Sequence, residues 1–202
     1  GTGVSLAAFY HPLRLAEEVA LLDDLSGGRV NWGAGRGFDR TEMENFQVPI
    51  EESYDRFREN FEIVLKAWAE GSFTHDGTHH TFNDVEVLPK PLQDPMPVWL
   101  ATSTQTAVDW AAEQGHAILM DPHSTHAEIG QKRASYNATM QSHHHLLGQD
   151  IPVARLIAVA ETDAKAEAVA RAGAEWTVGG YASDKKGGLN ALQIASEGVA
   201  NR

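Results

Sequence analysis

The chain has 202 residues, which is enough for one sizeable domain with an extensive core. Its formal net charge of -12 argues against nucleic acid and anionic membranes as partners, and its basic residues are scattered among acidic ones. The absence of cysteine excludes disulfides, thiolate metal sites and a cysteine nucleophile. No apolar run reaches membrane-spanning length and no signal peptide opens the chain, so we expect a cytoplasmic protein.

The first predicted elements alternate between strand and helix. The opening residues, 1–6, include no initiator methionine and resemble the inside of a strand. His11-Pro12 predicts a helix start, because a proline at the first helical position loses no hydrogen bond. Apolar residues recur at helical spacing up to Gly27-Gly28, where the glycines predict that the helix ends.

The segment that follows combines a small-residue strand with an arginine. A β-prone run at 29–35 contains alternating glycines, and Arg36 comes directly after it. Gly33 and Gly35 are two apart, so they share one face of the strand. A face without side chains leaves space in which another group can approach the backbone. The charged guanidinium beside it suits a phosphate, although a solvated turn is the alternative interpretation.

A long helical excursion comes next. Residues 39–50 are irregular and polar, and residues 51–70 form the strongest predicted helix. Its apolar stripe is interpreted as core rather than as a ligand site. The stripe consists of Tyr54, Phe57, Phe61, Val64, Leu65 and Trp68.

A hairpin and a proline-rich connector complete the excursion. Asp76-Gly77 predicts a tight turn with positive φ inside a hairpin at 73–82. Three histidines lie in it, and we interpret them as solvated because no further ligand at a suitable spacing completes a metal site. They are His75, His79 and His80. Four prolines between 89 and 97 then predict an extended connector without a helix.

A second strand-to-helix junction carries hydroxyl side chains. A short buried strand at 98–101 leads through 102–106 into a helix that ends near Gln114. Free backbone N–H groups and the helix dipole make such a junction suitable for an anion. Ordinary N-capping by Ser103 or Thr104 explains the same residues and is compatible with anion binding.

The remaining chain continues the alternation. We expect a strand at 117–120, a polar helix from about Thr125 and another strand at 154–160. A histidine run at 143–145 is interpreted as a solvated helix end. An alanine-rich helix from Thr162 to about Val178 precedes a loose tail from about 179.

Regular alternation of strands and helices predicts an α/β fold with a parallel sheet. A doubly wound sheet and a (β/α)8 barrel both fit, and both bind ligands at the carboxyl ends of their strands. Arg36 and the hydroxyls of Ser103 and Thr104 all follow strands, so we predict that they share one phosphate. We treat residues 1–202 as one domain, with an irregular excursion at about 71–97.

The chain resembles the luciferase-like flavin-dependent monooxygenases, the relatives of bacterial luciferase. The resemblance covers much of residues 1–120 in the family's order and is looser beyond them. The matching stretches are 11–18, 25–29, 33–37, 88–91, 97–101 and the helix start at 103–112.

This resemblance implies a TIM-type (β/α)8 barrel that holds reduced flavin at the carboxyl ends of its strands. It assigns the flavin phosphate to Arg36, with Ser103 and Thr104, and places Gly35 against the isoalloxazine ring. The family's unusual cis peptide near the flavin ring maps to Gly3-Val4.

The resemblance also implies that the barrel is incomplete here. About five strands are expected, and the first two and at least one late strand are lacking. The family's catalytic histidine belongs to one of those absent strands, and His11 is interpreted as a helix-entry residue instead. The catalytic residue is therefore unknown, and no metal site is expected.

The function that the resemblance implies is oxygen insertion into a small organic substrate by reduced FMN and O2. A hydride-transfer enzyme that uses the deazaflavin F420 is one alternative. A non-catalytic flavin-binding subunit or fragment is another. A flavin reductase as supplier of reduced flavin and assembly as a homodimer are the expected partnerships, the latter involving the helix at 11–25.

Overall fold

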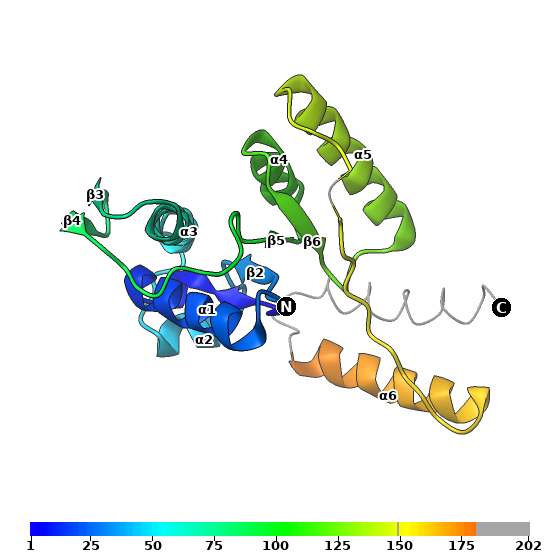
Figure 1. Cartoon of the computed structure of the whole chain (residues 1–202). Coiled ribbons are helices and arrows are strands. Elements are labelled where there is room, and N and C mark those ends of the chain that lie inside the picture. The colour runs from blue at the N-terminus through cyan, green and yellow to red at the C-terminus, as the bar shows by residue number, and fades with distance from the viewer. Residues whose placement is uncertain (149, 181–202) are drawn as a thin grey trace. The chain divides into compact units, whose positions relative to one another are not determined.

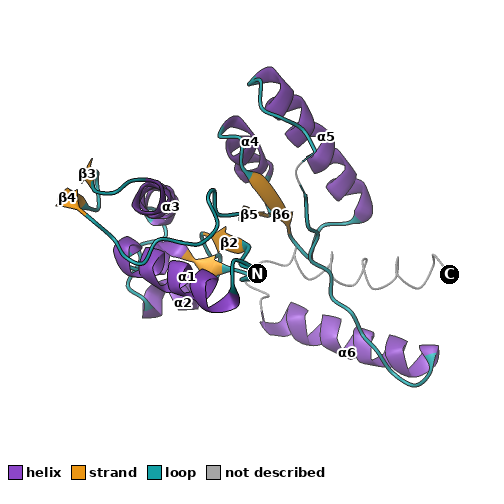
Figure 2. Cartoon of the chain, viewed as in Figure 1, coloured by secondary structure: helices purple, strands orange, loops and turns teal. Residues whose placement is uncertain are grey.

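The computed structural model describes residues 1–148 and 150–180. The chain divides into two compact units, Gly1–Ala101 and a second unit that begins at Thr102, and each is described by itself. Figures 1 and 2 show strands and helices alternating along the chain. This confirms the α/β fold with parallel strands, and the described strands do not close a barrel.

The first unit contains a parallel sheet in the order β1-β2-β5. The strands are β1 (Ser5–Leu6), β2 (Trp32–Gly35) and β5 (Val98–Thr102). Ser5 lies opposite Ala34, and Trp32 lies opposite Val98. All four residues of β2 are buried, which places the small-residue strand in the middle of the unit.

The first unit also contains helices. They are the short 3-10 helix η1 (Ala7–Phe9), α1 (Pro12–Ser26), α2 (Arg40–Asn45) and α3 (Ser53–Ala69). The expectation that residues 39–50 are irregular is wrong at α2, whose start is capped by the Asp39 side chain. Pro12 begins α1, and Gly27 ends it in the left-handed conformation at φ 69°, both as predicted. Helix α3 packs against α1 (Figure 1). The indole N–H of Trp68 in α3 donates to the Ala16 carbonyl of α1 at 3.0 Å.

The aromatic stripe of α3 forms core along most of its length. The Trp32 ring stacks on Phe61 with 5.6 Å between centroids and meets Trp68 edge-on at 5.0 Å. Phe57 is also buried. The prediction that Tyr54 belongs to this core is wrong, because its side chain lies in the first turn of α3 and is 40% exposed.

The hairpin consists of β3 (Phe73–Asp76) and β4 (Thr81–Val85), which pair antiparallel. Asp76 pairs with Thr81, so residues 77–80 form a four-residue loop. The tight turn predicted from Asp76-Gly77 is therefore wrong, and Gly77 does not adopt a positive φ. A carboxylate from α3 binds this loop from outside the hairpin, as described below.

The connector to β5 contains no helix, as its prolines predict. The peptide bonds before Pro89 and Pro95 are cis. The ammonium of Lys90 donates to the Ala67 carbonyl at 2.7 Å, and the Gln93 side chain donates to the buried Asp23 at 2.7 Å. These bonds hold the connector against α3 and α1.

The second unit contains one strand and three helices within the described residues. They are β6 (Ala117–Met120), α4 (Gln105–Glu113), α5 (His126–Ser142) and α6 (Asp163–Gly180). Helices α4 and α5 pack together, and the Tyr136 hydroxyl of α5 donates to the His116 carbonyl at 3.0 Å. Met120 forms an isolated parallel bridge with Val153.

The strand predicted at 154–160 is wrong. Among the described residues this segment pairs with no strand beyond the bridge at Val153, and its apolar side chains are exposed, Ile157 by 82% and Val159 by 86%. Alternating apolar residues favour a strand, but a strand also requires a neighbour for its backbone hydrogen bonds. A loose tail is predicted from about residue 179. Its residues from 181 onward lie outside the described part of the chain.

The start of α5 is a capping box. The Thr125 hydroxyl accepts from the backbone N–H of Glu128, and the Glu128 carboxylate accepts from the Thr125 N–H at 2.7 Å. We expect Thr125→Ala to lower the free energy of unfolding by about 1 kcal/mol, measured by urea denaturation. Thr139→Ala removes the same atoms within the same helix and should leave stability unchanged or raise it slightly. Equal losses in both variants would contradict a specific role for the cap.

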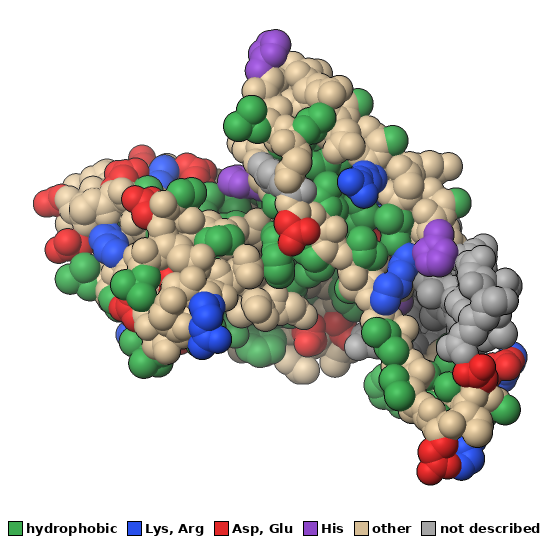
Figure 3. Space-filling model, turned by 45° about the vertical axis from the view of Figure 1, so that its right-hand side comes forward, with side chains coloured by type: hydrophobic (Ala, Val, Ile, Leu, Met, Phe, Trp, Pro, Cys, Tyr) green, Lys and Arg blue, Asp and Glu red, His purple; other side chains and the backbone are tan. Residues whose placement is uncertain are grey.

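The surface shows no concentration of basic residues on the face in Figure 3, where Lys and Arg side chains lie among acidic and apolar ones. None of the described helices is long and apolar enough to cross a lipid bilayer.

Candidate functional site

Arg36 lies directly after β2, at the carboxyl end of the parallel sheet in the first unit. Its Nη1 donates to the Ser53 hydroxyl at 2.8 Å, and that hydroxyl donates to the Ile50 carbonyl at 2.6 Å. The guanidinium carbon lies 4.1 Å from the centroid of the Tyr54 ring, a cation–π distance. Within the described residues, the other N–H groups of this half-buried side chain have no protein acceptor. The guanidinium of Arg36 is therefore held by Ser53 and Tyr54, and its remaining N–H groups are available to donate to a ligand.

Ser53 and Tyr54 were not predicted as site residues. They occupy the first turn of α3, and Ser53 is fully buried while Tyr54 is exposed on one side. The signal that could have identified them is their place in the sequence, where a polar segment enters a helix. A side chain there can face back toward the ends of the strands instead of into the core.

The glycine face of β2 is occupied by the chain itself. A Cβ at Gly33 would lie 2.2 Å from the Thr2 carbonyl oxygen, and one at Gly35 would lie 2.8 Å from a methyl carbon of Val4. The Thr2 hydroxyl also donates to the Gly33 carbonyl at 2.8 Å. The expectation of empty space above these glycines is therefore corrected, because residues 2–4 fill it. Contact between Gly35 and a flavin ring stays a prediction.

The Gly3-Val4 peptide bond is cis, which is the conformation that the family resemblance implies at this position. Gly3 is exposed, and a Cβ built on it would have open space within 4 Å. The role of Gly3 and Val4 toward a cofactor stays a prediction.

Ser103 and Thr104 precede α4 in the second unit, and both are exposed. The Thr104 hydroxyl accepts from the Ala107 N–H at 3.3 Å, so the N-capping interpretation is confirmed. Its own hydrogen remains available for donation, as does the exposed hydroxyl of Ser103. Because these residues and Arg36 belong to different units, their convergence on one phosphate stays a prediction.

A carboxylate organises the histidine loop of the hairpin. Glu59 of α3 accepts from the backbone N–H groups of Thr78, His79 and His80 at 2.8–3.1 Å, and the His75 ring lies 3.3 Å away. The interpretation of His75 as solvated is wrong, since its side chain is only 7% exposed. Sequence spacing missed this partner because Glu59 lies on another element. His11 contacts the rings of His80 and Phe82, consistent with a helix-entry role.

These contacts predict a pH-dependent contribution to stability. Burial alone would raise the pKa of Glu59, but hydrogen bonds from His79, His80 and His75 hold it below its ordinary value of 4.5. Glu59→Gln should lower the free energy of unfolding by about 1–2 kcal/mol at neutral pH. Since the folded-state pKa is depressed, this difference should be present above pH 4.5 and shrink as the pH falls through the folded-state value.

Urea denaturation of both proteins between pH 7 and pH 3 measures this difference. Glu62→Gln is the matched control, because Glu62 lies on the same helix and its one ion pair within the described part of the chain is an exposed pair with Lys66. A difference between wild type and Glu59→Gln that stays constant across this range would contradict the linkage.

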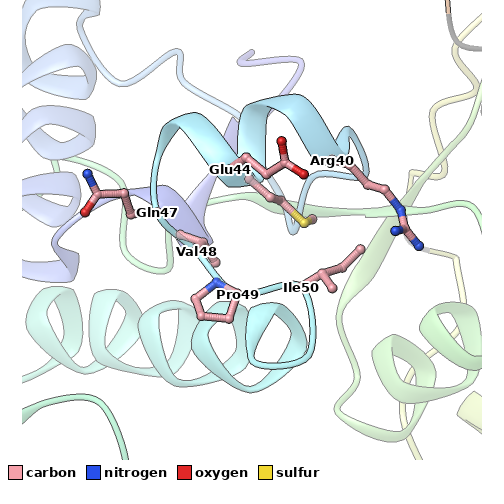
Figure 4. Close-up of a pocket in the computed structure, with 7 residues that line it drawn as sticks. Arg40, Glu44, Gln47, Val48, Pro49 and Ile50 are labelled. Carbon is pink, nitrogen blue, oxygen red and sulfur yellow. The ribbon is translucent and has the colours of Figure 1, made fainter.

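A shallow hollow of about 310 Å³ lies beside α2 in the first unit. Figure 4 shows Val48, Pro49 and Ile50 facing the helix that carries Arg40 and Glu44. Its lining does not include Arg36. We assign no ligand to this hollow.

Parallel strands joined by helices, with an anchored arginine at a strand's carboxyl end, define an α/β protein with a candidate anion site at the ligand-binding edge of its sheet. The model of the luciferase-like monooxygenase family matches residues 1–198, and the chain belongs to that family. The resemblance to this family that the sequence motifs indicate is therefore confirmed.

One curated relative is the oxygenase component of a flavin-dependent trigonelline monooxygenase from Acinetobacter baylyi. It is 29% identical over 175 residues, which cover 84% of this chain and 48% of the relative. The chain spans at most about half the length of such curated relatives.

Two solved structures share the fold. Monooxygenase RslO1 from Streptomyces bottropensis is 32% identical with a TM-score of 0.75, covering 99% of this chain and 59% of that one. The oxygenating constituent of 3,6-diketocamphane monooxygenase from Pseudomonas putida, solved with FMN, has a TM-score of 0.74 at 17% identity. That match covers 96% of this chain and 58% of the other, and at this identity it shows the fold alone.

Proposed function

We propose that the complete protein is a flavin-dependent monooxygenase that uses reduced FMN and O2 to oxidise a small organic substrate. The observation that carries this proposal is the anchored guanidinium of Arg36 at the carboxyl end of β2. Membership of the luciferase-like monooxygenase family and the flavin-dependent relative support it. A separate flavin reductase is the proposed source of reduced flavin, since that relative is an oxygenase component. A cytoplasmic homodimer is the proposed state.

The residues present fit the phosphate end of FMN. Arg36 has a fixed orientation and unused N–H donors, which suit a phosphate dianion. Ser103 and Thr104 would add hydroxyls and the N-terminus of α4. When bound, reduced flavin supplies the chemistry with oxygen, while these residues bind and orient it. The residue that moves protons during the reaction is unassigned.

Titration of the complete protein with FMN tests the role of Arg36. Arg36→Ala should weaken FMN binding about 10- to 100-fold, because it removes charge-assisted hydrogen bonds to the phosphate. Arg36→Lys should retain part of the affinity, since it keeps the charge and loses the fork. Riboflavin, which has no phosphate, should bind wild type and both variants alike.

Arg40→Ala is the matched control, because Arg40 is an exposed arginine four residues away and makes no contact with Ser53 or Tyr54 that the structure records. Equal FMN affinities for wild type and Arg36→Ala would remove Arg36 from the site. Turnover supported by F420 alone would replace the proposal with hydride transfer. Flavin binding by the complete protein without substrate-dependent oxygen consumption would indicate a non-catalytic subunit.

A further inference from the structure

We propose that Lys132 is a positioning residue for the phosphate-binding junction at the start of α4. The inference rests on the proposed function and adds a residue that lies on another helix, α5. Lys132 does not belong to the predicted site, and it would act on the phosphate through the backbone of Ser103.

The ammonium of Lys132 is held by three acceptors. It donates to the Ser103 carbonyl at 2.7 Å, to the Ser124 hydroxyl at 2.6 Å and to the Asp121 carboxylate at 3.0 Å. Its side chain is 12% exposed, and that of Asp121 is 13% exposed. A lysine with all three N–H bonds satisfied in a mostly buried position has one geometry, unlike a solvated surface lysine.

The bond to Ser103 determines the direction of a backbone donor. In a planar trans peptide the carbonyl of Ser103 and the N–H of Thr104 point in opposite directions. Because Lys132 holds the carbonyl, it also holds the Thr104 N–H on the opposite side. Among the described residues that N–H makes no hydrogen bond, as is usual for a donor at a helix N-terminus. The neighbouring residue Thr102 is 2% exposed, and its hydroxyl also has no hydrogen-bond partner among the described residues.

Further bonds join the same elements and make the junction stiff. The Gln105 side chain of α4 donates to the Ser135 hydroxyl of α5 at 2.8 Å. The loop that supplies Asp121 and Ser124 is also held by Arg155, which donates to the Ser124 carbonyl at 2.9 Å. Lys132 therefore joins three segments: the start of α4, the loop after β6 and α5.

Lys132 also neutralises a carboxylate near the junction. Burial would raise the pKa of Asp121, but hydrogen bonds from Lys132 and Ser124 hold it below its ordinary value, so the group is ionised at neutral pH. Without the ammonium, this negative charge would oppose a phosphate at the start of α4. Lys132 therefore has two effects, fixing the backbone at Ser103 and neutralising Asp121, and both should strengthen phosphate binding at the start of α4.

The test compares two ligands on the complete protein by fluorescence titration. Lys132→Met should raise the Kd for FMN about tenfold and change the Kd for riboflavin less than about twofold, because riboflavin lacks the phosphate. Lys132→Arg keeps the charge and should recover part of the loss. Arg133→Met, which removes an exposed cation from the next position of α5, should leave both constants unchanged.

The outcomes separate this inference from the proposed function. A selective loss of FMN affinity in Lys132→Met, with partial recovery in Lys132→Arg, supports it. An equal loss for both ligands, or no loss, overturns it. If Arg36→Ala weakens FMN selectively while Lys132→Met does not, the proposed function stands and this inference fails. If wild type does not prefer FMN to riboflavin, the phosphate site itself fails.

Should Lys132→Met not fold, Ser124→Ala provides a second test. It removes one acceptor of the ammonium and should give a smaller loss of affinity that is again selective for FMN.

Discussion

Asp23→Ala should lower the free energy of unfolding by about 4 kcal/mol, because it leaves buried N–H donors without an acceptor. Asp23 is fully buried at the end of α1. Its carboxylate accepts from the Val30 N–H at 3.2 Å, the Gln93 N–H at 3.0 Å and the Gln93 side chain at 2.7 Å. One side chain therefore joins α1, the approach to β2 and the connector before β5.

Urea denaturation of the complete protein measures this loss. Asp24→Ala is the matched control, since Asp24 is the next residue and is only half-buried, and we expect it to cost less than about 0.5 kcal/mol. Asp23→Asn should fall between the two, because the amide can accept fewer of these hydrogen bonds. Equal midpoints for Asp23→Ala and Asp24→Ala would contradict a structural role for the network.

The same carboxylate should contribute to acid sensitivity. Burial would raise the pKa of Asp23, but hydrogen bonds from Gln93, Val30 and Leu92 hold it below its ordinary value of 3.8. Because the folded-state pKa is depressed, its contribution to stability is present above pH 3.8 and is lost as the pH falls through the folded-state value. The stability difference between wild type and Asp23→Asn should shrink in that acid range.

Gly33→Ala should destabilise the first unit by about 3 kcal/mol or more, as overpacking against backbone does. The added Cβ would lie 2.2 Å from the Thr2 carbonyl oxygen and 2.9 Å from a methyl carbon of Val4. The Thr2 hydroxyl is bonded to both backbone groups of Gly33, so the segment cannot move away without losing those bonds. We expect a lower denaturation midpoint and displacement of residues 2–4.

Two other glycines complete this series. Gly35→Ala should cost less than Gly33→Ala, because its added Cβ would meet the end of the Val4 side chain at 2.8 Å rather than backbone. Gly71→Ala is the matched control, since nothing lies within 4 Å of its added Cβ and its φ is not positive. A Gly33→Ala protein as stable as Gly71→Ala would show that residues 2–4 do not pack on β2 as described.

Local signals in the sequence predict the long helices of this protein, although they miss the short helix α2. Pro12 begins α1, Gly27 ends it, and Thr125 caps α5, because each acts through its own backbone and the next few residues. The same kind of signal places Arg36 after a buried strand, where the carboxyl ends of parallel strands collect ligand-binding groups. Strands are predicted less well. The segment at 154–160 has a strand-like pattern but lacks a partner among the described residues.

By itself, the sequence determined the order of most strands and helices, the family and the arginine at the end of β2, but not α2 or the absence of a strand at 154–160. Only the tertiary structure showed that Ser53 anchors Arg36, that Thr2 and Val4 fill the glycine face, and that Glu59, Asp23 and Lys132 each bind backbone on another element. The physical reason is the distance along the chain over which each kind of interaction acts. Periodicity, caps and turn residues act over a few positions along the chain. The partner of a buried charge is chosen by which distant segments the packed core brings within about 3 Å.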